Sequence, residues 1–157
     1  MKIAFLFTGK TDESWVQEGL DTYARRLVHY CTPEVITLLP PRNTARGTPA
    51  EVKSAEGRLI LSKLLPGDRL VLLDEAGKSY SSQEFSAWIG KQQLAGVKRV
   101  VFATGGAFGF SEEVYARADE KLSLSKMTFT HQMVRVIFAE QVYRAFTILR
   151  GEKYHHA

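Results

Sequence analysis

The stretch that decides the fold is Arg99-Val100-Val101-Phe102-Ala103-Thr104-Gly105-Gly106-Ala107-Phe108-Gly109-Phe110-Ser111, residues 99–111. It begins with a continuous apolar run, which is typical of a strand buried on both faces of a parallel sheet. A glycine-rich turn follows, and Ser111 is suited to cap a short helix over residues 111–118. A buried strand that leads through a turn into a helix is the repeating unit of an α/β fold.

The same alternation extends outward in both directions from this stretch. Apolar runs and helically spaced apolar residues recur, separated by turn-forming residues. We therefore expect one α/β domain over residues 1–157, with a mostly parallel sheet and helices on both faces. The other predicted strands cover residues 2–8, 34–39, 69–73 and 121–124. The other predicted helices cover residues 12–28, with Thr11 and Asp12 as caps, 50–64, 82–94 and 131–149.

Three predicted loops follow strands and should meet at one edge of the sheet. They cover residues 74–78, 104–110 and 125–130. Ligands of parallel α/β sheets bind beyond the carboxyl ends of the strands, so these loops form the predicted site. Residues 42–49 are expected to form a separate, exposed basic loop.

Composition and charge narrow the classes of function. One cysteine, Cys31, is too few for an internal disulfide or a cysteine-rich zinc site, and the histidines are not spaced as metal ligands, so we predict no metal. No apolar run approaches the roughly 20 residues that span a bilayer, so we expect a cytoplasmic protein without membrane contact. The net charge of +4 gives weak support to partners that carry phosphate.

Two loops each allow two interpretations. The glycine-rich turn is either a tight strand-to-helix connection or a loop whose main-chain N–H groups approach a ligand. Its spacing matches neither the dinucleotide-binding fingerprint nor a phosphate-binding P-loop. Residues 122–131 carry small hydroxyl and apolar side chains, which either enclose an adenine or only connect a strand to the last helix.

The last helix and the tail carry polar residues with equally open roles. His131 and Arg135 share one helix face, and phosphate contact and structural pairing of Arg135 are equally supported. The spacing of Glu140 and Arg144 favours a surface ion pair. The tail, which includes Tyr154, His155 and His156, suits stacking on an unpaired RNA base, and a frayed end is the alternative.

Several of these segments resemble the bacterial RlmH family, the ribosomal RNA large subunit methyltransferase H group of the SPOUT class. The likeness runs nearly end to end and is most specific over residues 122–155. The matching segments are Gly105-Gly106-x-x-Gly109, residues 122–129, His131-Gln132 with Arg135, Glu140-Gln141-x-Tyr143-Arg144-Ala145 and Tyr154-His155.

The resemblance implies a C-terminal trefoil knot, a homodimer and S-adenosylmethionine as cofactor. It also implies methylation of N3 of a pseudouridine in large-subunit (23S) ribosomal RNA, on the assembled ribosome. The cofactor contacts that carry over are Leu73, Gly105, Leu124, Ser125, Lys126, Met127, Thr128 and Phe129, and Gly106 joins them by its position.

The expected reaction is an in-line methyl transfer in which the protein mainly supplies alignment. His155 is the candidate base, directly or through a water, because histidine titrates near neutral pH. Tyr154 would stack on or orient the target base, and Arg135, the third catalytic candidate, would hold a phosphate. The further residues expected to contact RNA are Arg42, Arg46, His131 and Arg144.

Two rival functions stay open at this point. A SPOUT methyltransferase acting on transfer RNA would have a similar pocket, although the lack of an added RNA-binding domain favours a large, preassembled substrate. A non-catalytic nucleotide-binding module that associates with the ribosome would use the same glycine loop and basic face.

Overall fold

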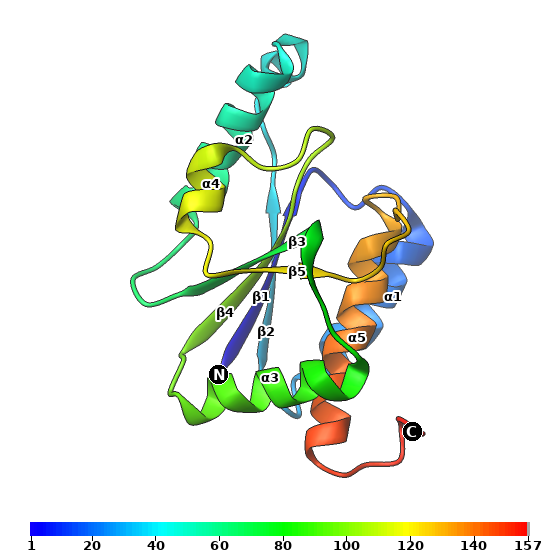
Figure 1. The fold of residues 1–157 in the computed structure, drawn as a ribbon. Coiled ribbons are helices and arrows are strands. Elements are labelled where there is room, and N and C mark those ends of the chain that lie inside the picture. The colour runs from blue at the N-terminus through cyan, green and yellow to red at the C-terminus, as the bar shows by residue number, and fades with distance from the viewer. Residues whose placement is uncertain (157) are drawn as a thin grey trace.

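The computed structural model describes residues 1–156 and is built on one sheet of five strands. Neighbouring strands all pair in parallel, in the order β2-β1-β4-β3-β5 (Figure 1). Parallel pairing brings the carboxyl ends of all strands to one edge, and the predicted α/β fold is confirmed. The strands are β1 (Lys2–Thr8), β2 (Thr32–Leu38), β3 (Arg69–Ser79), β4 (Arg99–Thr104) and β5 (Glu120–Ser123).

Helices cover both faces of this sheet. Successive side chains of a strand point to opposite faces, and on each face they pack with helices into a separate apolar core. In β1, Phe5 faces the core under α1, α3 and α5, whereas Leu6 faces the core under α2 and α4 (Figure 1). Among residues 1–156, no helix has both the length and the apolar character needed to cross a membrane. The helices are α1 (Ser14–Leu27), α2 (Pro49–Ser62), α3 (Ser82–Leu94), α4 (Glu112–Arg117) and α5 (Met133–Leu149).

The first helix is capped from the far end of the chain, which corrects the prediction of Thr11 and Asp12 as caps. Helix α1 begins at Ser14, and its N-cap residue makes no side-chain cap hydrogen bond. Instead, the Gln132 side-chain oxygen accepts hydrogen bonds from the main-chain N–H groups of Asp12 and Glu13, at 2.8 and 3.4 Å. This cap joins the N-terminus of α1 to the segment that leads into α5.

Strand β3 is longer than predicted, and the turn expected at 74–78 is wrong. Leu122 of β5 pairs with both Leu73 and Lys78, so a register shift separates two paired segments of β3. Gly77 lies in this shift, against the main chain of β5, where a Cβ atom would come within 2.5 Å of the Lys121 carbonyl carbon. Residues 74–77 therefore pass around β5 at close range. The trefoil knot that the resemblance implies stays a prediction.

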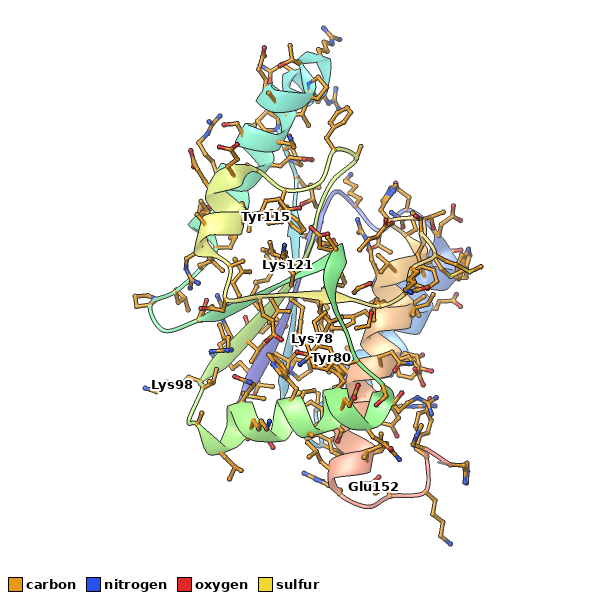
Figure 2. The ribbon with its side chains drawn as sticks, in the orientation of Figure 1. Lys78, Tyr80, Lys98, Tyr115, Lys121 and Glu152 are labelled. Atoms are coloured by element: carbon orange, nitrogen blue, oxygen red, sulfur yellow. The ribbon has the colours of Figure 1, made fainter. Side chains whose placement is uncertain are left out.

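Side chains hold the short strand β5 where it starts. The Glu120 carboxylate accepts hydrogen bonds from the Tyr80 hydroxyl and from the Trp88 indole, the latter at 2.7 Å. The Lys121 ammonium lies 5.6 Å from the centroid of the Tyr115 ring (Figure 2). These contacts fix the point from which the chain leaves the sheet toward residues 124–130.

A buried arginine ties the start of α5 to the end of β1. Arg135 is 0% exposed. Its guanidinium donates hydrogen bonds to the carbonyl oxygens of Thr8 and Gly9, both at 3.0 Å. It also donates to the Thr11 hydroxyl at 2.9 Å and to the His131 carbonyl at 3.1 Å. Full burial argues against the predicted phosphate contact and catalytic role, and for the internal pairing that the sequence left open.

We predict that Arg135→Met lowers the free energy of unfolding by about 3 kcal/mol or more, because it leaves buried carbonyl groups without donors. Urea denaturation followed by circular dichroism measures this change. The control is Arg25→Met, which removes an exposed guanidinium from α1 and should change the free energy by less than about 0.5 kcal/mol. Equal stability of the two variants would contradict the role assigned to Arg135.

Candidate active site

A cavity of about 660 Å³ opens at the carboxyl edge of the sheet. Residues at or just after the ends of four strands line it, together with residues at the register shift of β3, so the site lies where the parallel topology predicts one. The three loops expected to converge all contribute to its walls. Representative lining residues, in order of strands β2, β1, β4, β3 and β5, are Pro40, Gly9, Gly105, Leu73 and Ser123.

One wall is the glycine-rich turn between β4 and α4. Gly109 has a φ of 82°, which favours glycine, and its main-chain N–H donates to the Gly106 carbonyl at 3.1 Å. The predicted cap of α4 is confirmed, because the Ser111 side chain accepts a hydrogen bond from the Val114 N–H at 3.3 Å. A compact turn thus presents the main chain of Gly105 and Gly106 to the cavity.

The facing wall is the segment that follows β5. The Ser125 hydroxyl accepts a hydrogen bond from the Met127 main-chain N–H at 2.9 Å, which folds the segment into a tight turn. The Thr128 hydroxyl donates to the Glu75 carboxylate at 2.6 Å, so this wall is joined to β3. Across the cavity, the Tyr115 hydroxyl of α4 donates to the Asp74 carboxylate at 2.5 Å, and Figure 2 marks Tyr115. Both walls are therefore tied to the bulge of β3.

The structure brings most of the predicted cofactor residues together. Lys126 is the exception, because it is exposed and lies outside the cavity lining. The role of these residues as cofactor contacts stays a prediction. Those that line the cavity are Leu73, Gly105, Gly106, Leu124, Ser125, Met127, Thr128 and Phe129.

Sequence reasoning missed the acidic side of the cavity. Its lining includes the carboxylates of Glu56, Asp74 and Glu75, and no lysine or arginine of the described chain lines it. Asp74 and Glu75 fall in the segment 74–78, which was expected at the site as a loop, but neither carboxylate was predicted to have a role there. Glu56 comes from the middle of α2 and belongs to no motif, so no signal in the sequence points to it.

The predicted tail residues do not line this cavity but pack on α1 and α5. The Tyr154 ring packs edge-on against Tyr143, with centroids 4.8 Å apart, and its hydroxyl donates to Glu140 at 3.0 Å. Arg144 donates to His155 Nδ1 at 3.0 Å and pairs with Glu140 at 2.5 Å. The tail is thus docked, and the ion pair expected at the surface is partly buried.

Tyr154 is held as a neutral phenol. Burial raises its pKa well above the usual value, and the hydrogen bonds to Tyr23 and Glu140 raise it further. A phenol in this state donates a hydrogen bond and offers an aromatic surface, but it does not accept a proton near neutral pH.

The other residues predicted to contact RNA lie in two places. His131 lines the cavity and is exposed. Arg42 and Arg46 are exposed on a short 3-10 helix, η1 (Arg42–Arg46), where an irregular loop was expected. This helix follows Pro40, which lines the cavity, so the two arginines lie beyond the β2 side of the site.

Comparison with known proteins places the chain in a family. The family model described as "Predicted SPOUT methyltransferase" matches residues 1–155. Proteins named ribosomal RNA large subunit methyltransferase H are similar over 99% of both chains. They include those of Parabacteroides distasonis, 50% identical, Porphyromonas gingivalis, 49% identical, and Christiangramia forsetii, 50% identical. The chain therefore belongs to the SPOUT methyltransferase family, within its ribosomal RNA large subunit methyltransferase H group.

Proposed function

We propose that this protein is an S-adenosylmethionine-dependent methyltransferase that acts on N3 of a pseudouridine in 23S ribosomal RNA. The observation that carries the proposal is the convergence of two strand-end loops and the bulge of β3 on one cavity, in a chain of this family. The substrate would be the assembled ribosome, which would place the protein in the cytoplasm.

The cavity fits the proposed methyl donor in size and chemistry. Its volume of about 660 Å³ lies within the range of about 300–1,000 Å³ that is usual for small-molecule sites. Leu73, Leu124 and Phe129 supply apolar surface for an adenine, and the main chain beside them supplies hydrogen-bonding groups. Acidic side chains and the lack of lysine and arginine in the described lining suit a cationic donor.

The protein's own contribution to the reaction is mainly positional. When bound, S-adenosylmethionine supplies a methyl group on a sulfonium that is already activated. The residues around it must hold the target nitrogen in line, within about 3–3.5 Å of the reacting carbon, and exclude water. The cavity walls are suited to this task, because they are held in place before the ligand binds. The hydrogen bonds that hold them to β3 are Thr128–Glu75 and Tyr115–Asp74.

The tail residues would act in the cavity of a second copy of the chain. Tyr154 and His155 are docked on Glu140 and Arg144, outside the cavity lining of their own chain. Helix α5 has 17 residues and is about 25 Å long, with the cavity near its start and the tail folded along its second half. Antiparallel pairing of α5 with its copy about a two-fold axis would bring each tail toward the other cavity.

An exposed apolar surface supports such a homodimer. Trp15 near the start of α1 is 50% exposed, and Met133 at the start of α5 is 37% exposed. Gln132 joins these two helix ends through its hydrogen bonds to residues 12 and 13. Large apolar side chains at adjoining helix ends are typical of a protein–protein contact.

His155 could act as a base at Nδ1 only after the Arg144 guanidinium moves away from it. A guanidinium only donates hydrogen bonds, so the bond from Arg144 occupies the Nδ1 lone pair of a neutral His155. A phosphate of bound RNA that attracts Arg144 would free this nitrogen to accept the proton from the target base, directly or through a water. Tyr154, as a neutral phenol, would orient the base by stacking or hydrogen bonding.

The first test is methyl transfer from labelled S-adenosylmethionine to ribosomes that lack the modification. We expect one methyl group per large subunit on a pseudouridine, located by mass spectrometry of RNA fragments, and none on bulk transfer RNA. Transfer to transfer RNA alone would contradict the proposed substrate. Calorimetry that detects no S-adenosylmethionine binding would contradict the enzyme function and favour the non-catalytic module.

A complementation test asks whether the tail of one chain acts in the cavity of the other. His155→Ala should lower the methylation rate about 100-fold or more, and Gly106→Val should abolish it, because the added side chain would strike Glu56 and fill the cavity. Coexpressed, the two variants form mixed dimers that contain one intact cavity served by one intact tail. About a quarter of the wild-type rate should then return. Dimers that stay inactive, or a protein that sediments as a monomer, would rule out a tail acting in the partner's cavity.

The basic helix η1 is tested by the salt dependence of ribosome binding. Replacing Arg42 and Arg46 with alanine should flatten the slope of log affinity against log salt by roughly 1.5, because two phosphate contacts are lost. The control replaces Lys2 and Lys98, two exposed cations at the opposite edge of the sheet, where Figure 2 marks Lys98. If both double variants keep the wild-type slope, η1 does not contact RNA.

A further inference from the structure

Glu56 is a buried acid that the folded chain leaves incompletely paired. It lies on α2 and is 9% exposed. Among the described residues, its Oε1 atom has no hydrogen-bond partner. An unpaired buried carboxylate destabilises a fold, so it calls for an explanation, and a bound ligand is one.

The position of Glu56 ties it to the cavity. Glu56 lines the cavity beside Gly106, and a Cβ on Gly106 would lie 2.5 Å from both carboxylate oxygens. Glycine at position 106 therefore provides the room that this carboxylate occupies. Pro40 follows β2 and Gly106 follows β4, whereas residues 124–129 follow the edge strand β5 on the other side of β3, so Glu56 lies on the side of the cavity away from residues 124–129.

Of the three cavity carboxylates, Glu56 is the one with an oxygen, Oε1, that stays unpaired among the described residues. Asp74 accepts hydrogen bonds from Tyr115 and from the Ala76 N–H, and Glu75 accepts one from Thr128. No lysine or arginine of the described chain lines the cavity to neutralise Glu56. Burial raises the pKa of Glu56, because desolvation disfavours the charged form, and a cationic ligand would reverse that effect.

We propose that the Glu56 carboxylate binds the α-ammonium group of the amino-acid arm of the methyl donor. This assignment rests on the proposed function. With the adenosyl portion held by Leu73 and residues 124–129, the amino-acid arm is the part of the ligand that can reach the opposite wall. An ammonium carries both a positive charge and hydrogen-bond donors, whereas a sulfonium carries no donor and a ribose hydroxyl no charge.

Calorimetry with three related ligands tests the assignment. S-adenosylmethionine has the ammonium and the sulfonium, S-adenosylhomocysteine has only the ammonium, and 5′-methylthioadenosine has neither. We expect Glu56→Gln to raise the dissociation constants of the first two by about 10-fold or more and to leave that of the third unchanged. Unchanged binding of 5′-methylthioadenosine also shows that the cavity of the variant is intact. The control, Glu113→Gln, removes an exposed charge from α4 and should change none of the three constants.

The other outcomes overturn the assignment in distinct ways. Weaker binding of S-adenosylmethionine alone would mean that Glu56 faces the sulfonium, and weaker binding of all three would mean that it faces the ribose. Equal binding by the wild type and Glu56→Gln would leave Glu56 without a role in binding this ligand. A wild-type protein that binds none of the three overturns the proposed function itself.

Discussion

The pairing of β5 with two segments of β3, on either side of a bulge, is the constraint on which the cavity depends. Leu122 pairs with β3 at two positions, and Gly77 meets the main chain of β5 where a Cβ would come within 2.5 Å. This pairing brings the segment after β5 against the bulge of β3, where it lines the cavity together with the glycine turn after β4. Without it, the sheet would still be a parallel α/β sheet, but one wall of the cavity would be missing.

Two polar side chains from the C-terminal part of the chain then hold the β1 side of the site in place. Arg135 and Gln132 lie at the start of α5, and both bind the main chain of the segment after β1. Buried polar groups of this kind specify one arrangement, because any shift leaves several hydrogen bonds unmade. Residues that line the cavity are thus held by residues that do not line it, and Arg135 is better described as a positioning residue than as a catalytic one.

Features that depend on local interactions could be predicted from the sequence, whereas features that depend on contacts between distant segments could not. Apolar runs and helical spacing are local, so the strands and helices were predicted closely, and α3 over 82–94 matches in both bounds. The convergence of the loops also followed, because parallel strands share an edge. The cap from Gln132, the second pairing of β3 and the approach of Glu56 to Gly106 are contacts between distant segments, and no local pattern encodes them. Arg135 shows the same limit, since its spacing from His131 identified a shared helix face but not its burial.

Charge is distributed in this chain in a way that suits two different ligands. The net charge is +4, yet the described cavity lining holds three carboxylates, those of Glu56, Asp74 and Glu75, and no lysine or arginine. In the proposed function, exposed arginines on η1 would attract RNA phosphates to the surface, whereas the acidic cavity would repel them and favour a cation. In the proposed reaction, transfer of the methyl group removes the positive charge of the sulfonium. The attraction of the cavity for its ligand therefore falls once the chemistry is complete, and this favours exchange of the spent cofactor over its retention.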